Sequence, residues 1–255
     1  MENLDAMHRE ESEEPVFGRA GVTNLNRFRK DPYLVLLTAR RSHAAEEFRK
    51  IVVCLGEEES ASAGPSGLLM VLSPLEGEGK TLTALNLALA LAQDSERRTL
   101  LVDFDFRRPR VEEFLVERGR DGLADALREK GSVEDLIQFC PREKLHVLTA
   151  GSSAEQSATL LHSENLRPLL AQLRNSFDIV VGDCPPLLPF AESRALASKG
   201  DSVVMVVRAE STPRSALTEA VALLDPQRFR GVVLNAVPAN RWLRYRYATD
   251  KRRKD

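Results

Sequence analysis

A glycine-rich segment with one lysine, residues 74–81, has the residue types of a phosphate-binding loop. It reads Pro-Leu-Glu-Gly-Glu-Gly-Lys-Thr and lies between the apolar run 68–72 and a helix-like stretch. A strand that leads through a glycine turn into a helix directs unpaired N–H groups and the positive helix end at one point. Lys80 can reach the β- and γ-oxygens of a nucleotide, and the Thr81 hydroxyl can ligate magnesium. The predicted nucleotide contacts are Glu76, Gly77, Glu78, Gly79, Lys80, Thr81 and Leu82.

Three aspartates lie near the ends of two predicted strands. Asp103 and Asp105 belong to the end of the apolar run 99–104, and Asp183 ends the run 178–183. In open parallel sheets, ligands bind beyond the carboxyl ends of the strands, so these side chains should converge on the glycine loop. Together they could hold magnesium beside a triphosphate and accept a proton from an incoming nucleophile.

Each motif also has a simpler interpretation. The first glycine of the G-x-x-x-x-G-K-[ST] pattern would fall at Pro74, and an ordinary strand–turn–helix corner with a surface lysine is the alternative. Aspartates often end strands and cap helices. The nucleotide interpretation is favoured because the lysine loop and the acidic strand ends all fall where one site needs them. Two later strand ends add Arg208 and Asn235 as candidate contacts to the nucleotide.

The alternation of apolar strands with helices predicts an α/β fold with a doubly wound, mostly parallel sheet flanked by helices. The 255 residues, 43% of them hydrophobic and 29% charged, are enough for one main domain. Short helices are expected near 123–126 and 133–139. The predicted strands are 68–72, 99–104, 145–148, 178–183, 202–207 and 231–234, and the longer helices in this part of the chain are 82–93, 164–174, 191–197 and 214–224.

Four regions follow from the patterning along the chain. Residues 1–31 are polar and predict a mobile arm. Residues 32–67 predict a helix, over 32–55, and a Ser/Ala/Gly/Pro-rich linker that would let this helix pack elsewhere. Residues 68–237 predict the P-loop domain. Residues 238–255 form a basic tail with two tyrosines, which could be solvated or could touch an anionic membrane surface.

Composition excludes several other classes of protein. A net charge of −2 argues against a dedicated nucleic-acid binder. Cys54, Cys140 and Cys184 are scattered, so neither a disulfide nor a zinc site is expected. No apolar stretch approaches the ~20 residues that span a bilayer, and the acidic N-terminus does not resemble a signal peptide, which predicts a cytoplasmic chain.

The loop, the segment Asp103-x-Asp105-x-Arg107-Arg108-Pro109 and the segment Asp183-x-Pro185-Pro186 resemble the bacterial tyrosine kinases of capsule and exopolysaccharide synthesis. The resemblance runs from about residue 45 to residue 237. It implies a P-loop fold with deviant Walker A, A′ and B motifs, and ATP- and Mg²⁺-dependent autophosphorylation of tyrosine. It also implies roles for individual residues: Lys80 binds phosphate, Asp103 is the proposed base, Thr81, Asp105 and Asp183 hold magnesium, and Tyr245 and Tyr247 accept phosphate from a neighbouring subunit.

The resemblance further implies a membrane polysaccharide co-polymerase or activator as partner, and a homo-oligomer. The ring-forming motif Glu-x-x-Arg-x-x-Arg is present only as Glu46 and Arg49, with Val52 in the last position, which counts against a ring. An ATP-binding regulator or scaffold of the export complex is therefore the alternative from another class. Partition and septum-positioning ATPases share the fold, but their signature lysine would fall at Leu75, which favours the kinases.

Overall fold

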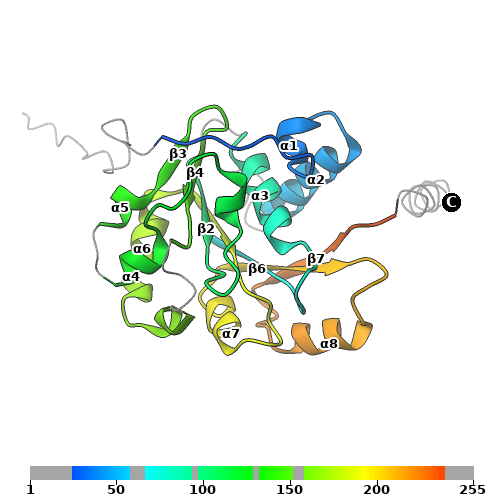
Figure 1. Ribbon diagram of the computed structural model, residues 1–255. Helices are drawn as coiled ribbons and strands as arrows, with labels where there is room; N and C mark the ends of the chain where they lie inside the picture. Colours follow the sequence, from blue (N-terminus) through cyan, green and yellow to red (C-terminus); the bar gives the residue numbers. More distant parts are fainter. Residues whose placement is uncertain (1–24, 58–66, 94–96, 129–131, 152–157, 239–255) are drawn as a thin grey trace, which may run out of the picture.

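The computed structural model describes residues 25–57, 67–93, 97–128, 132–151 and 158–238, and these form one seven-stranded sheet with helices on both faces (Figure 1). The strand order is β3-β4-β2-β5-β1-β6-β7. The strands are β1 (Gly67–Leu72), β2 (Thr99–Asp103), β3 (Gln138–Cys140), β4 (Leu145–Leu148), β5 (Ile179–Asp183), β6 (Ser202–Arg208) and β7 (Phe229–Asn235). The helices are α1 (Val35–Thr38), α2 (His43–Glu57), α3 (Lys80–Leu91), α4 (Leu123–Leu127), α5 (Val133–Leu136), α6 (Leu166–Ser176), α7 (Ala191–Ala197) and α8 (Arg214–Ala222), with 3-10 turns η1 (Val111–Phe114) and η3 (Ala158–His162).

The sheet is parallel except for the antiparallel pair β3 and β4. Strand β1 lies between β5 and β6, so the loop that follows β1 is flanked by the ends of both neighbours. In the register of β2 and β5, Asp103 is opposite Asp183. The expected doubly wound parallel sheet is confirmed, and its register brings two of the predicted acidic strand ends side by side.

Successive residues of β1 point to opposite faces and enter two separate cores. Leu68 and Met70 pack on the face covered by α4, α6 and α7, whereas Leu69 and Val71 pack on the face covered by α1, α2 and α3. Because both faces are buried, the strands read as continuous apolar runs instead of alternating ones.

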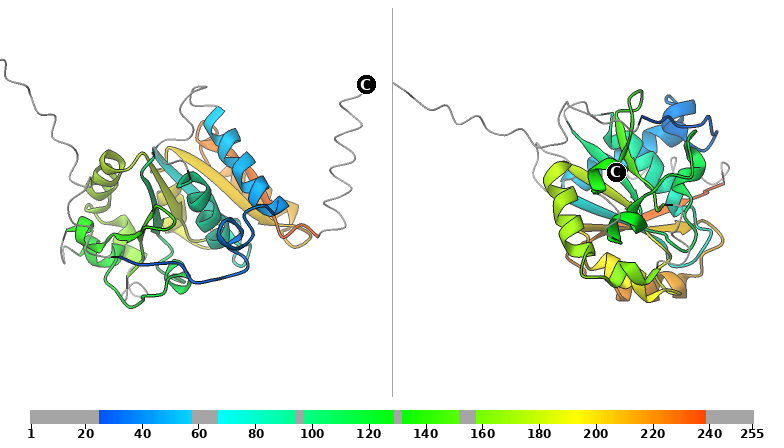
Figure 2. Two further views of the ribbon diagram at one scale, coloured as in Figure 1. Left: turned by 90° about the horizontal axis from the view of Figure 1, so that it is seen from above. Right: turned by 60° about the vertical axis from the view of Figure 1, so that its left-hand side comes forward.

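The N-terminal region differs from the prediction of a mobile arm followed by an independent helix. Residues 25–31 lie on the domain, where Leu25 pairs with Phe139 and the buried Phe28 with Leu115. The expected helix over 32–55 is split into α1 and α2. Both helices contact α3, and Figure 2 shows α2 running alongside it. Residues 1–24 and the tail from 239 onward lie outside the described residues.

Several element boundaries also differ, for local reasons. The helix predicted over 133–139 ends at Leu136, because residues 138–140 pair with β4 and Gln138 accepts a hydrogen bond from Asn26. The turns η1 and η3 were not expected. Helix α3 begins at Lys80, two residues earlier than predicted. Within the described ranges, no helix has the length and apolar character needed to cross a bilayer.

Candidate nucleotide-binding site

The loop between β1 and α3 has the backbone conformation that its glycines predict. Gly77 and Gly79 have positive φ angles of 77° and 89°, in the left-handed region that favours glycine. A Cβ at Gly79 would lie 2.0 Å from Nδ2 of Asn235, so the backbone can pass here only without a side chain. Helix α3 starts directly after Gly79, which directs its free N–H groups at the loop.

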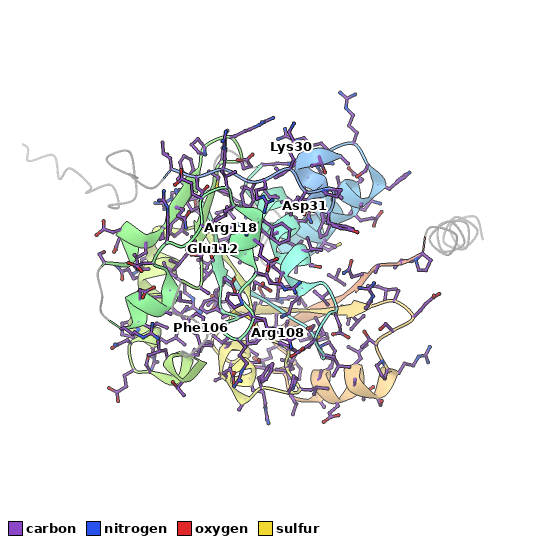
Figure 3. The ribbon with its side chains drawn as sticks, in the orientation of Figure 1. Lys30, Asp31, Phe106, Arg108, Glu112 and Arg118 are labelled. Carbon is purple, nitrogen blue, oxygen red and sulfur yellow. The ribbon has the colours of Figure 1, made fainter. Side chains whose placement is uncertain are left out.

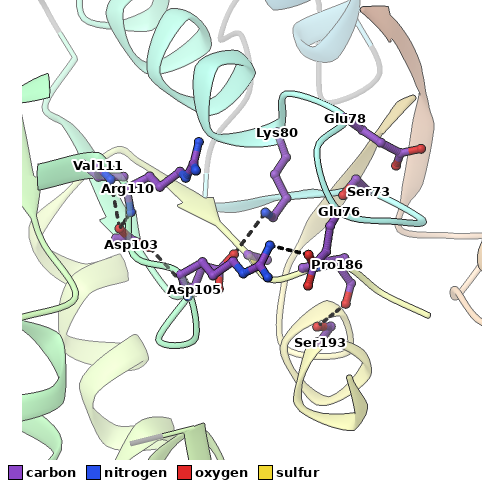
Figure 4. A network of polar contacts seen from close by, with 12 residues as sticks. Ser73, Glu76, Glu78, Lys80, Asp103, Asp105, Arg110, Val111, Pro186 and Ser193 are labelled. Atoms are coloured by element: carbon purple, nitrogen blue, oxygen red, sulfur yellow. Dashed lines mark hydrogen bonds and ion pairs between the residues drawn. The ribbon is translucent and has the colours of Figure 1, made fainter. Parts of the chain in front are cut away.

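Lys80 points from the first turn of α3 toward the acidic strand ends (Figure 4). Its Nζ lies 3.0 Å from Oδ2 of Asp105, and both side chains are largely buried, at 12% and 3% exposed. Burial lowers the pKa of Lys80, but the carboxylates of Asp183 and Asp105 outweigh it and the pKa is raised overall. Lys80 is therefore held as a cation at the centre of the site.

Asp183 is the residue whose surroundings most clearly lack a partner. It is fully buried, and neither carboxylate oxygen has a hydrogen-bond partner of normal geometry among the described residues, although the Thr81 hydroxyl lies close enough to lower its pKa. Burial raises its pKa to about 6, although the Lys80 ammonium opposes this shift. An unpartnered buried carboxylate close to a threonine hydroxyl suits a magnesium ion that keeps several waters and phosphate oxygens as its remaining ligands. Within the described chain, no group of three or more acidic, His or Cys side chains could hold a metal unaided.

Asp103 has a different environment from the other two aspartates. Its Oδ1 accepts the N–H of Asp105 at 3.0 Å, and its Oδ2 accepts the N–H groups of Arg110 and Val111, both at 3.1 Å. Burial raises its pKa well above the usual range, with a smaller contribution from Asp183. These bonds fold residues 104–111 around Asp103, whereas Asp105 lines the open cavity and Asp103 does not.

Arginines from that folded segment form one wall of a cavity of about 510 Å³. Arg107 pairs with the buried carboxylate of Glu192 and lies 4.3 Å above the ring of Phe190. Arg108 pairs with Glu76 of the loop, and both residues line the cavity. The cavity also includes Gly77, Gly79, Lys80, Thr81, Leu82, Asp105, Arg110, Phe114, Pro186 and Arg208.

The remaining predicted contacts, Glu78, Arg208 and Asn235, hold the loop from behind. Glu78 is 4% exposed and accepts the N–H of Leu75 at 3.0 Å as well as the hydroxyl of Thr212. The Asn235 amide donates to the carbonyl of Glu78 at 2.9 Å, and Arg208 donates to the carbonyl of Gly77 at 3.5 Å. Of these three, only Arg208 lines the cavity.

Sequence reasoning missed Thr212, Glu192 and Phe190, which act on the loop or the arginine wall from α7 and from the segment before α8. No local pattern marks them, because each is recognised only by the residue it contacts. The phosphoacceptors proposed from the sequence, Tyr245 and Tyr247, lie outside the described residues. The three cysteines are free, with Cys140 and Cys184 buried and Cys54 exposed.

A glycine loop with its lysine at the start of a helix, on a parallel sheet of this order, defines a P-loop NTPase domain. A family profile described as an AAA domain matches residues 72–225, more than half of the chain. The chain is 32% identical over 217 residues to the succinoglycan biosynthesis transport protein ExoP of Rhizobium meliloti, covering 83% of this chain but only 27% of ExoP. It is 28% identical over 216 residues to the tyrosine-protein kinase YwqD of Bacillus subtilis, covering 84% of this chain and 90% of YwqD.

Solved structures agree with these relatives. The kinase domain of VpsO is 33% identical and superimposes with a TM-score of 0.65, covering 77% of this chain and all of that one. The chimerical protein CapA2B2 is 26% identical, with a TM-score of 0.72 over 84% of this chain and 94% of the other. This chain therefore belongs to the bacterial tyrosine kinase family of capsule and exopolysaccharide biosynthesis.

Proposed function

We propose that this protein is an ATP- and Mg²⁺-dependent protein-tyrosine autokinase that regulates polysaccharide synthesis and export. The observation that carries the proposal is the convergence of Lys80, Asp105 and the unpartnered Asp183 at one end of the glycine loop. Kinship with tyrosine kinases supports the reaction type, and the arginine wall suits a polyphosphate.

In this proposal the oxygen of an acceptor tyrosine forms a bond to the γ-phosphorus while the bond from that phosphorus to the bridging oxygen breaks and ADP leaves. Lys80 and the loop amides stabilise the charge on the transferred group. Thr81, Asp105 and Asp183 would hold magnesium, which supplies charge neutralisation on the phosphates when it is bound. The phenolic proton passes to a carboxylate.

The two candidates for that proton acceptor, Asp103 and Asp105, have different surroundings. Both oxygens of Asp103 accept loop N–H groups, and Asp103 does not line the cavity. Asp105 does line it, with one oxygen accepting the N–H of Arg108 at 3.0 Å and the other paired with Lys80 at 3.0 Å. This contrast favours Asp105 as the carboxylate that meets the substrates, either as a magnesium ligand or as the proton acceptor, and Asp103 as the organiser of the arginine segment. Asp105→Asn should then reduce kcat in a folded protein, whereas Asp103→Asn should lower the unfolding temperature as well.

The decisive experiment is incubation of the full chain with magnesium and γ-labelled ATP, followed by mapping of the label by mass spectrometry. Label on Tyr245 or Tyr247 that is lost in Lys80→Met would establish the autokinase. Phe replacement of both tyrosines is the matched control for the acceptor. ATP binding without tyrosine labelling would contradict the proposal.

The second candidate function is an ATP-binding regulator of the export complex. The incomplete ring-forming motif on α2, which lacks its last arginine, favours this candidate. Arg49 bonds within its own subunit, to Glu46 at 3.2 Å and to the carbonyl of Arg40 at 2.9 Å, while Val52 packs against the core. The hydrogen-bond partners of Arg49 lie within its own subunit, and Val52 has no charge to offer a neighbour. Sedimentation of the full chain with and without Mg-ATP tests for assembly, and a ring would weaken this alternative.

The proposed setting is the cytoplasmic face of a membrane, with a polysaccharide co-polymerase or activator as partner. The likeness to the chimerical protein CapA2B2 supports a partner of the CapA type. A partition or septum-positioning ATPase is disfavoured because Leu75 stands in place of the signature lysine and its N–H is used inside the loop, bonded to Glu78. ATP-dependent dimerisation in solution would revive that third interpretation.

A further inference from the structure

A second cavity, of about 390 Å³, adjoins the nucleotide cavity. Phe114, in the turn η1, lines both cavities. In Figure 3, Arg118 and Glu112 lie between Lys30 above and Arg108 below. Its lining consists of Arg29, Lys30, Asp31, Glu113, Phe114 and Arg118.

Three cations, Arg29, Lys30 and Arg118, line this cavity against two carboxylates, Asp31 and Glu113, so the lining carries one net positive charge. Arg29 and Arg118 donate to the backbone carbonyl of Glu113, at 3.3 and 2.5 Å, and neither forms an ion pair with a described carboxylate. Lys30 is exposed and has no hydrogen bond or ion pair there. Of the two carboxylates, Asp31 accepts the N–H of Tyr33 at 2.8 Å. Backbone contacts thus hold the two guanidinium groups in place, and their positive charge can still pair with an anionic group of a ligand.

The cations of the nucleotide cavity itself would face the phosphates of ATP, whereas this second group of cations lies on the other side of Phe114. The tail that carries Tyr245 and Tyr247 is a poor electrostatic match for it. Residues 239–255 contain Arg241, Arg244, Arg246, Lys251, Arg252, Arg253 and Lys254 against only Asp250 and Asp255. Bringing this tail to a cationic cavity would place like charges together.

We propose that the second cavity is an acceptor subsite that selects tyrosines in acidic protein segments, and that another protein with such a segment is a better substrate than the basic tail of this chain. The inference rests on the proposed kinase function and narrows its substrate class. Acidic residues next to the tyrosine would contact Lys30 and the two arginines, while the tyrosine ring passes Phe114 toward the γ-phosphate.

The test compares two peptides that share a central tyrosine and are flanked either by glutamates or by lysines. With the full chain and Mg-ATP, the acidic peptide should have the higher kcat/KM, on the order of tenfold at low salt from several weak exposed contacts, and mainly through KM. The preference should shrink at high salt, because exposed charges are screened. Anisotropy binding of both peptides with a non-hydrolysable ATP analogue gives a readout that does not need phosphoryl transfer.

Charge reversal identifies the subsite. Lys30→Glu should reduce the preference for the acidic peptide about fivefold, roughly the value of one exposed charge contact, and Arg118→Gln should act in the same direction. Arg214→Glu, an exposed cation on α8 away from both cavities, is the matched control and should leave the preference unchanged.

The outcomes separate the subsite from the proposed activity. Acidic-peptide binding that depends on Lys30, without labelling of either peptide, would support the subsite while contradicting the kinase. The inference would be overturned by equal kcat/KM for the two peptides, or by a higher kcat/KM for the basic peptide or for the chain's own tail. It would also be overturned if Lys30→Glu left the preference for the acidic peptide unchanged.

Discussion

Replacing Asp183 by asparagine should stabilise the nucleotide-free protein while weakening its response to magnesium nucleotide. The carboxylate is fully buried, and among the described residues neither of its oxygens has a hydrogen-bond partner of normal geometry. Its pKa is raised to about 6 by burial, against about 3.9 for an unfolded aspartate. An ionised group in this place destabilises the fold, and a bound cation would remove that penalty.

The magnitude follows from the two pKa values. A difference of about 2 units corresponds to about 3 kcal/mol of unfolding free energy. Because the folded state holds its proton more tightly, the unfolding free energy falls as pH rises from about 4 to about 6 and stays low above that. Asparagine removes this loss but leaves a buried amide with unmade hydrogen bonds, which costs ~1–2 kcal/mol. The net gain at pH 8 should be about 1–2 kcal/mol, or roughly 2–8 °C in Tm.

The assay is thermal and urea unfolding of wild type and Asp183→Asn at pH 8 and pH 4.5, with and without Mg-ADP. The advantage of the variant should be present at pH 8, shrink toward pH 4.5, and be reversed when saturating Mg-ADP stabilises only the wild type. Asp121→Asn, on an exposed aspartate, controls for the loss of one negative charge. A variant less stable than the wild type at pH 8 without nucleotide would refute the reasoning.

Three further predictions test other parts of the site and fold. Gly79→Ala should weaken ATP binding about tenfold by titration with a fluorescent nucleotide, because a left-handed alanine costs ~1–2 kcal/mol and its Cβ meets Asn235; unchanged affinity would mean that the loop yields freely. Glu76→Gln should release Arg108 and tighten nucleotide binding by a few-fold at low salt but not at high salt, as expected for an exposed pair; the same gain at both salts would contradict this. Burial lowers the pKa of His146 to about 4, so acid should remove up to about 3 kcal/mol of stability as pH falls from about 6.5 to 4, and His146→Phe should flatten that slope in urea unfolding.

The parallel α/β fold could be predicted from the sequence because both faces of its strands are buried. Such strands are continuous apolar runs bounded by recognisable turn and loop residues. For five of the six predicted core strands, the predicted first residue lies within one residue of the observed one. The strand β7 begins two residues before its prediction, at Phe229. By contrast, β3 was read as helix, because its strand conformation depends on pairing with β4 and on the contact of Gln138 with Asn26.

The sequence by itself determined which groups gather around the loop. A glycine at a left-handed position, a lysine at a helix start and aspartates at strand ends are local features, since backbone conformation and strand direction fix where they point. These features were enough to anticipate that Lys80, Asp105 and Asp183 would meet.

Only the tertiary structure decided how those groups differ from one another. Asp103 and Asp105 are two residues apart in the same segment, yet one is enclosed by loop amides and the other faces the cavity. The second cavity joins residues 29–31 to residues 113–118, which are separated by the whole of β1, α3 and β2. Protonation, charge balance and access depend on neighbours brought together by folding, and no spacing along the chain encodes them.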